Sequence, residues 1–264
     1  FSASRTGALM KTAYKQLQRH LLLLVAVLAL GACSTAPVMQ GDAVIEPSFP
    51  ADRVLDSDIT YLSDEISDPW EGFNRSMYRF NYRFDKYVFL PVVNGYKFIT
   101  PDFLEQGIHN FFLNLEDITT FFNSILQLNA TKTVQTTGRF LVNTTVGLLG
   151  FIDVASKLDM PKHDEDFGQT LGHWGVGNGP FLVLPVLGPS NVRDSVGLGV
   201  DWVMYTAVQD ELDMKESEEW ALAIMRGIDT RANLAFRYYE TGTPFEYEWV
   251  RLLYTTKRKM DIEK

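Results

Sequence analysis

The apolar runs of this chain are short. The longest, Leu21–Ala32, contains twelve residues, whereas a helix needs about 20 apolar residues to cross a bilayer. A second apolar stretch, residues 140–155, is interrupted by polar side chains that include Asn143 and Asp153. The sequence therefore predicts no membrane-spanning helix, and its apolar side chains must be arranged along amphipathic elements instead.

The first short run belongs to a segment with the layout of a secretory signal. Residues 1–9 precede Met10, three basic residues between positions 11 and 19 follow, and the apolar run comes next. A basic start, a short apolar middle and small residues at the end are typical of such a signal. We expect residues 1–32 to be a signal peptide, with residues 1–9 upstream of the true translation start.

The signal ends in LGAC, residues 30–33, which resembles the bacterial lipoprotein signal whose cysteine is acylated and becomes the mature first residue. Cys33 is the only cysteine in the chain, so no internal disulfide is expected. An ordinary buried cysteine is the disfavoured alternative. Ser34 follows in place of aspartate, which by the usual sorting rule favours the outer membrane of a Gram-negative bacterium. We expect lipidation at Cys33 and a flexible tether over residues 33–67.

The charge balance limits the partners of the mature chain. Without residues 1–32 it keeps 20 Lys and Arg against 33 Asp and Glu, a net charge of −13. A nucleic-acid-binding protein would present a basic surface, so this class is disfavoured. The remaining residues 68–264 are enough for one domain.

The clearest predicted helix begins near Asp68, a natural N-cap, with Pro69 at its first position. Apolar residues recur at helical spacing and form one stripe: Phe73, Met77, Phe80, Phe84 and Val88. The opposite side is basic: Arg75, Arg79, Arg83 and Lys86. Two interpretations remain open. The helix either faces the core with a solvated charged side, or lies in a membrane interface, where Arg75, Arg79 and Arg83 contact lipid headgroups.

Further amphipathic helices follow. The pattern is clear for residues 111–125 and 220–234, weaker for residues 134–148, and present again for residues 245–252. Strand-like alternation is scarce except near residues 181–186. The predicted fold class is therefore all-α, with one domain over residues 68–264.

A glycine-rich stretch, residues 172–194, interrupts the helical pattern. It is not a dinucleotide or phosphate loop, because a β-like run rather than a helix follows Gly179 and no Lys-Ser/Thr pair is present. We expect residues 170–171 and 181–184 to form two arms joined by a flexible turn, a mobile apolar flap hinged at Gly175, Gly177, Gly179 and Pro180. A plain surface hairpin is the alternative. Ser190 or Asn191 should cap the next helix.

The sequence gives few signs of catalytic or metal-binding chemistry. The chain has no G-x-S-x-G and no H-E-x-x-H motif. The run His163–Asp166 lacks the spacing of a calcium loop, so a solvated acidic turn is the favoured interpretation. His109 and His173 are expected to be structural. We expect no catalytic residue, no metal site, no cofactor and no enzymatic activity.

Three motifs resemble those of one family. Residues 68–75, DPWEGFNR, resemble the D-P-x-E-G-F-N-R opening of the MlaA/VacJ family of outer-membrane lipoproteins. Residues 150–155, GFIDVA, resemble a second signature, and residues 167–194, with FGQTLG, GVG, GP and RD, resemble a third. The resemblance covers the chain from Asp68 to about Asp201.

The resemblance implies a flat ring of amphipathic helices in the inner leaflet of the outer membrane, around an amphipathic channel, with a Gly-rich hairpin loop that influences its opening. It implies association with trimeric porins. It also implies that misplaced outer-leaflet phospholipids pass to a soluble periplasmic (MlaC-like) carrier and on to an inner-membrane ABC transporter, which maintains lipid asymmetry. A sheltered route is reasonable, because exposing about 30 lipid methylenes to water costs on the order of 24 kcal/mol.

Two other functions stay open from the residues alone. The chain is either a structural envelope lipoprotein that supports porins without moving lipid, or a lipid hydrolase whose site is assembled from distant residues. The hydrolase is disfavoured because no Ser or His motif is recognisable.

Overall fold

The computed structural model describes residues 66–211, 214–240 and 243–264. Cys33, the signal peptide and the tether up to residue 65 lie outside these residues. The described part is mostly helical, and its elements are α3 (Glu71–Phe84), the π-helical turn η2 (Asp85–Phe89), α4 (Leu90–Ile99), α5 (Asp102–Leu126), α6 (Ala130–Thr145), α7 (Val154–Lys157), α8 (Phe167–His173), β1 (Phe181–Leu184), β2 (Gly188–Asn191), α9 (Val192–Glu211), α10 (Glu216–Asn233) and α11 (Glu246–Glu263).

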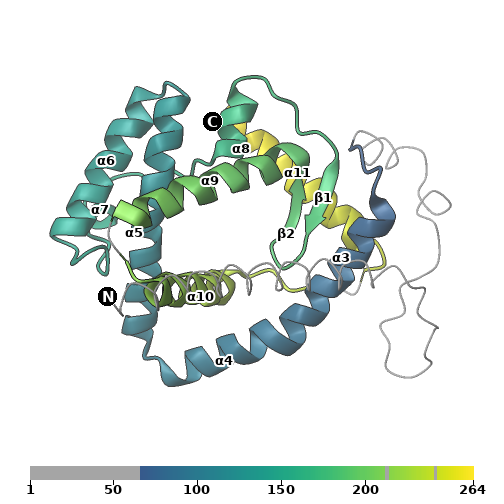
Figure 1. Cartoon of the computed structure of the whole chain (residues 1–264), viewed down its shortest axis with the longest axis horizontal. Helices are drawn as coiled ribbons and strands as arrows, with labels where there is room; N and C mark the ends of the chain where they lie inside the picture. The colour runs from purple at the N-terminus through teal and green to yellow at the C-terminus, as the bar shows by residue number, and fades with distance from the viewer. Residues whose placement is uncertain (1–65, 212–213, 241–242) are drawn as a thin grey trace, which may run out of the picture.

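The elements are arranged in a ring, although not in chain order (Figure 1). The continuous run α3, η2 and α4 forms one edge, and α5 turns away from the far end of α4 with α6 and α7 packed beside it. Across the ring, α9 faces α10, which packs on α4 and α5. The hairpin β1–β2 and α11 complete the ring next to α3. This confirms the predicted helical ring.

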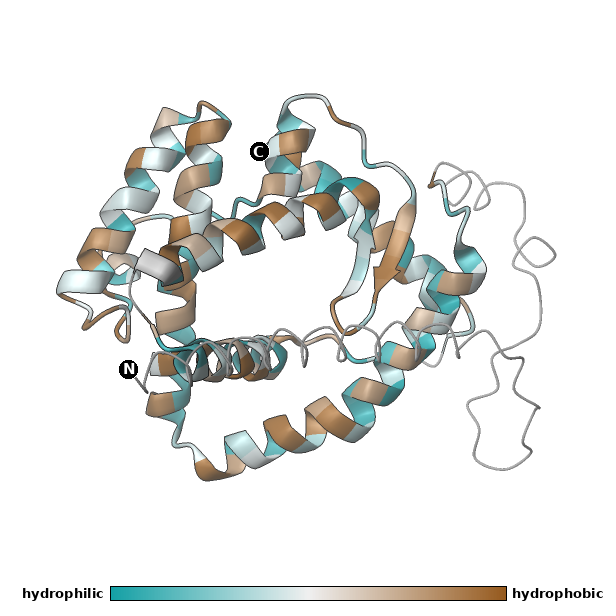
Figure 2. Ribbon diagram, viewed as in Figure 1, coloured by the Kyte–Doolittle hydropathy of each residue, from teal (hydrophilic) through white to brown (hydrophobic). Residues whose placement is uncertain are grey.

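The burial pattern is the reverse of that in an ordinary globule. Among the described residues, 10 hydrophobic side chains are buried, 25 polar or charged ones are buried, and 35 large hydrophobic ones are exposed. Figure 2 shows hydrophobic residues along the helices all around the ring. Within the described ranges, no helix combines the length and apolarity needed to cross a membrane. The helices therefore bury polar faces and turn apolar faces outward.

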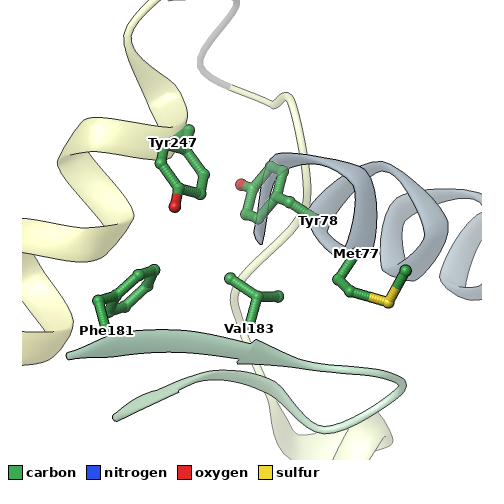
Figure 3. Close-up of a cluster of buried hydrophobic side chains, with 5 residues drawn as sticks. All are labelled: Met77, Tyr78, Phe181, Val183 and Tyr247. Atoms are coloured by element: carbon green, nitrogen blue, oxygen red, sulfur yellow. The ribbon is translucent and has the colours of Figure 1, made fainter. Parts of the chain in front are cut away.

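The largest apolar cluster joins three elements that are distant in sequence (Figure 3). Met77 and Tyr78 of α3, Phe181 and Val183 of β1, and Tyr247 of α11 pack together. The rings of Tyr78 and Tyr247 meet edge to face with their centroids 6.0 Å apart. This cluster anchors the hairpin between α3 and α11.

The first helix differs from its sequence-based prediction in two ways. It begins at Glu71, and Asp68 caps nothing. The Asp68 carboxylate instead accepts hydrogen bonds from Asn74 Nδ2 at 2.7 Å and from the Tyr247 hydroxyl at 2.5 Å. The predicted apolar stripe is divided: Met77 is buried in the apolar cluster, whereas Phe73 and Val88 are 40% and 44% exposed. The stripe therefore faces the core at Met77 and is exposed toward both of its ends.

The hairpin differs from prediction as well. Residues 170–171 belong to α8, so they are not an arm of the hairpin. Strand β1 pairs in antiparallel fashion with β2, with Phe181 opposite Asn191 and Leu184 opposite Gly188. The turn of the hairpin is therefore residues 185–187, and the glycine-rich loop connects α8 to β1. Asn191 caps α9 as predicted, since its Oδ1 accepts from Asp194 N at 2.8 Å.

Candidate functional site

The exposed apolar side chains form the most extensive unusual surface. The corner between α4 and α5 is the extreme case, where Phe98 is 90% exposed and Phe103 is 71% exposed. On α9, Trp202 is 66% exposed. Apolar surface in water is unfavourable by about 25 cal/mol per Å², and patches of this extent mark an interaction with a membrane or another protein.

A shallow groove opens beside the start of α3. Its walls are Trp70, Phe73, Leu182, Val192 and Val196, with Ser195 as a polar member, and its volume is about 610 Å³. That volume lies in the range of about 300–1,000 Å³ that is common for ligand pockets. The groove adjoins the glycine-rich loop, because a Cβ atom on Gly179 would lie 3.2 Å from Val192 Cβ. An apolar chain is the kind of group that such walls accept.

The four glycine-loop residues expected to form a flap have different roles. Gly175 ends α8 with a φ of +86°. Its N–H donates to Gly172 O at 2.9 Å, and Val176 N donates to Leu171 O at 2.9 Å. This pair of bonds is the Schellman motif that terminates helices. Gly175 is therefore needed to terminate α8.

The far end of the loop is also fixed. The N–H groups of Val192 and Arg193 donate to Pro180 O at 3.1 Å and to Asn178 O at 3.2 Å. Gly179 has a φ of +66°. Gly177 lies between these fixed ends, does not have a positive φ and has open space around it. Of the predicted hinge residues, Gly177 has the fewest structural constraints.

A buried charge cluster joins the two helices that flank the glycine loop to α11. Arg258 Nη1 donates to Asp166 Oδ2 at 2.6 Å, and Arg258 Nε donates to Asp194 Oδ2 at 2.7 Å. Arg193 and Tyr254 also donate to Asp194, at 2.8 Å each. We call Asp166, Arg193, Asp194, Tyr254 and Arg258 the ring clasp. It holds α8, α9 and α11 together.

The ionisation of the ring clasp follows from its pairing. Burial alone raises the pKa of Asp166 and of Asp194, but hydrogen bonds and the charge of Arg258 outweigh burial and lower both pKa values. Burial alone lowers the pKa of Arg258, and its bonds to the two carboxylates outweigh that effect and raise it. The three groups are therefore charged at neutral pH.

The run His163–Asp166 is not a solvated acidic turn. Asp166 belongs to the ring clasp, and Glu165 is only 6% exposed. Its carboxylate accepts from Lys132 Nζ at 2.5 Å and from Gln127 Nε2 at 3.0 Å. The prediction failed because both carboxylates find cations on helices that are distant in sequence. Among the described residues, no group of three or more His, Cys, Asp or Glu side chains is arranged to hold a metal ion.

Amide and hydroxyl groups extend the buried polar network to α5. Thr170 Oγ1 donates to Asn123 Oδ1 at 2.8 Å, and Asn123 Nδ2 donates to Asp201 Oδ1 at 3.0 Å. Gly168 makes room for the clasp, because a Cβ atom there would lie 2.5 Å from Asp194 Oδ1. Gly168 and Thr170 belong to the FGQTLG motif and Asp194 to the RD motif, whereas Asn123 and Asp201 lie outside both. The sequence signalled the motifs but not the contacts between them.

On the other side of the ring, the end of α10 is joined to η2 and to α5. Arg231 forms a two-point ion pair with Asp85, with N–O distances of 2.5 and 2.8 Å. Asp229 contacts His109 Nδ1 of α5 at 2.9 Å. His109 thus has a structural partner, as expected, although the sequence did not indicate which residue.

The three candidate headgroup arginines lie in different surroundings. Arg75 Nε donates to Glu71 at 2.7 Å, its Nη2 pairs with Glu248, and its guanidinium lies 4.4 Å from the centre of the Tyr247 ring. Arg75 is therefore part of the contact between α3 and α11. Arg79 and Arg83 of α3 are exposed.

Comparisons with known proteins agree on one family. The model of the MlaA lipoprotein family matches residues 66–261. An uncharacterized protein of Rickettsia prowazekii is 38% identical over 180 residues, which cover 66% of this chain and 69% of that protein. The Escherichia coli K12 protein named intermembrane phospholipid transport system lipoprotein MlaA is 38% identical over 173 residues, which cover 64% of this chain and 67% of that protein.

Other relatives match over a shorter span. A Rickettsia felis protein is 44% identical over 130 residues, about half of each chain at 49% and 52%. A structure solved in work on the structural basis for maintenance of bacterial outer membrane lipid asymmetry superposes with a TM-score of 0.61 at 31% identity, covering 74% of this chain and 99% of the other. With the ring and the three motifs in place, the chain belongs to the MlaA lipoprotein family.

Proposed function

We propose that this protein is a lipid-anchored component of the outer membrane that carries mislocalised phospholipids out of the outer leaflet. The observation that supports this function is the burial pattern: among the described residues, 35 large hydrophobic side chains are exposed and 25 polar or charged ones are buried. Such a ring is suited to lie among acyl chains, where outward apolar faces are favourable and internal polar faces satisfy one another.

The relatives support this function. The Escherichia coli protein is named for intermembrane phospholipid transport, and the similar solved structure comes from work on outer membrane lipid asymmetry. In our proposal, residues 1–32 are the signal peptide, Cys33 carries the acyl anchor, residues 33–67 are the tether and residues 68–264 form the ring. A phospholipid passes through an amphipathic channel in the ring, assisted by movement at Gly177.

The same proposal includes the protein partners of the ring. A trimeric porin would hold the ring in the outer membrane, and a soluble periplasmic MlaC-like carrier would receive the lipid and feed an inner-membrane ABC transporter. The transfer requires no covalent chemistry, so we propose no enzymatic activity. Incubation of the purified protein with labelled phospholipid checks this point, and release of fatty acid would show a hydrolase instead.

The deciding experiment compares cells with and without the chain. Phosphatidylethanolamine at the cell surface is labelled with an amine reagent that does not cross the membrane. Transport predicts that deletion raises the labelled fraction and that the intact gene restores it. If deletion changes porin level or envelope integrity with normal surface phospholipid, the protein is a structural lipoprotein and the transport proposal is wrong.

A further inference from the structure

Helix α3 and the turn η2 carry three separate stripes. The buried stripe combines the polar residues Asn74, Asn81 and Asp85 with Met77 and Tyr78 of the apolar cluster. One exposed stripe is apolar: Phe73, Phe80 and Val88. The other exposed stripe is basic: Arg79, Arg83 and Lys86. A surface divided lengthwise into apolar and basic halves is typical of a helix at the boundary between acyl chains and headgroups.

The π-helical turn keeps the apolar stripe in line. Val88 lies eight residues after Phe80, which in a continuous α-helix would place it about a fifth of a turn beyond the stripe. A π-helix has i→i+5 hydrogen bonds, so each turn contains more residues. The wider turn at Asp85–Phe89 reduces this offset, and Val88 is exposed as Phe80 is.

The acidic residues of α3 and η2 both form ion pairs within the protein. Glu71 pairs with Arg75 at 2.7 Å, and Asp85 pairs with Arg231 at 2.5 Å. Arg83 and Lys86 therefore place positive charge on this exposed side of α3 and η2. Positive charge at an exposed surface attracts an anionic group of a ligand outside the protein.

Lys86 is held between two tyrosines. Its Nζ donates to the Tyr82 hydroxyl at 3.3 Å and lies 5.6 and 5.5 Å from the centres of the Tyr82 and Tyr87 rings. Tyr87 is 69% exposed. Tyrosine is enriched at the level of lipid headgroups because its ring is apolar and its hydroxyl is polar.

We propose that Arg83 and Lys86 bind the phosphate groups of phospholipids whose acyl chains lie along the apolar stripe. The proposal rests on the proposed function, which places the ring in a leaflet, and adds which side of α3 lies at headgroup level. An acidic protein would match the basic stripe and leave the apolar one uncovered. A phospholipid covers both, because its phosphate and its acyl chains are covalently joined.

The test uses the full lipoprotein in its own membrane. A photo-crosslinking amino acid replaces Tyr87, and phospholipid adducts are measured by mass spectrometry. The variant that combines Arg83→Glu with Lys86→Glu should lower the adduct yield by about tenfold or more, since each cation at an anionic surface is worth about fivefold. Arg83→Lys, which keeps the charge, should leave the yield unchanged.

A matched control reverses two other exposed cations, with Lys157→Glu and Lys259→Glu together, and should give the wild-type adduct yield. Equal yields in both charge-reversed variants would overturn the proposal. So would adducts to a protein in place of lipid. In vesicles of anionic phospholipid, competition by inorganic phosphate beyond that of chloride at equal ionic strength would indicate a general phosphate site and also overturn it.

The same strains separate this proposal from transport. If the charge reversal abolishes the adducts and surface phospholipid stays normal, the headgroup site stands and plays no part in transport. If the adducts persist and surface phospholipid rises, transport is supported and the headgroup site is wrong.

Discussion

Asn74 and Asn81 lie two helical turns apart on α3 and close the same edge of strand β1 with their side-chain amides. Asn74 Oδ1 accepts from Val183 N at 2.8 Å, and its Nδ2 donates to Phe181 O at 3.0 Å. Asn81 repeats the arrangement beyond the end of the strand, with Leu184 O at 2.9 Å and the N–H of a turn residue at 2.7 Å. A side-chain amide offers the same donor and acceptor as a neighbouring strand, so the strand edge is satisfied.

Asn74→Asp should therefore destabilise the ring strongly. The carboxylate cannot donate to Phe181 O, and it would lie beside Asp68, which now accepts from Asn74 Nδ2 at 2.7 Å. A buried, unsatisfied charged group lowers the free energy of unfolding by about 3 kcal/mol or more. Thermal unfolding in detergent measures the change, with Arg83→Ala, an exposed position on the same helix, as the control. A stability loss equal to that of the control would contradict the role of Asn74.

Arg258→Met should open the ring clasp. It removes the cation from Asp166 and Asp194 and keeps an apolar side chain of similar length. Leaving a buried charge without any partner costs about 3–5 kcal/mol. Asp194 keeps Arg193, and the Asp166 side chain is 35% exposed, so we expect a smaller loss of about 2 kcal/mol. The neighbouring exposed Lys259→Met should change the free energy of unfolding by no more than about 0.5 kcal/mol. Similar small losses for both variants would show that the clasp does not hold the helices together.

The clasp also predicts the pH dependence of stability. The pKa values of Asp166 and Asp194 are lower in the folded protein than the ordinary value, which is about 3.9 in an unfolded chain. Their contribution is complete above that pH and is lost as the pH falls through the lowered values. Unfolding measured from pH 6 downwards should therefore show a steep loss of stability below about pH 4, and a weaker one in Arg258→Met. Parallel curves for the two proteins would refute this source of acid sensitivity.

Gly175 and Gly177 should respond differently to substitution. Gly175→Ala forces a side chain into a positive φ and should cost about 1–2 kcal/mol of stability. Gly177→Val meets open space and no positive φ, so the fold should tolerate it. If Gly177 is the flexible point, the valine variant will raise surface phospholipid at a normal protein level. Normal surface phospholipid in this variant would show that the loop has no role in opening the channel.

The exposed corner between α4 and α5 should help to hold the ring in the membrane. In a Cys33→Ser background, which removes the proposed anchor, we expect part of the protein to stay in the membrane fraction. Adding Phe98→Glu and Phe103→Glu should release it, since burial of each phenylalanine is worth about 2 kcal/mol. Asn94→Glu, exposed and polar on the same helix, is the control. Release by Cys33→Ser alone would show that the apolar surface does not insert.

The sequence determined the local structure and the family. The spacing of Phe73, Met77 and Phe80 predicted a helix, and Asn191 was predicted as a cap, because both signals lie within a few residues of each other along the chain. The absence of long apolar runs predicted helices that do not span a membrane. The three motifs indicated the family before any contact was known.

Only the tertiary structure decided which face of each helix is buried and what the motifs do. The periodicity around Phe73 gives two faces but cannot say which side meets a protein neighbour, and here Asn74 and Asn81 do so together with Met77. Arg258 meets Asp166 across 92 positions and Asp194 across 64 positions of the chain. Pairing over such separations is set by how the helices pack around the ring, because local spacing carries no information about which distant charge will compensate a buried one.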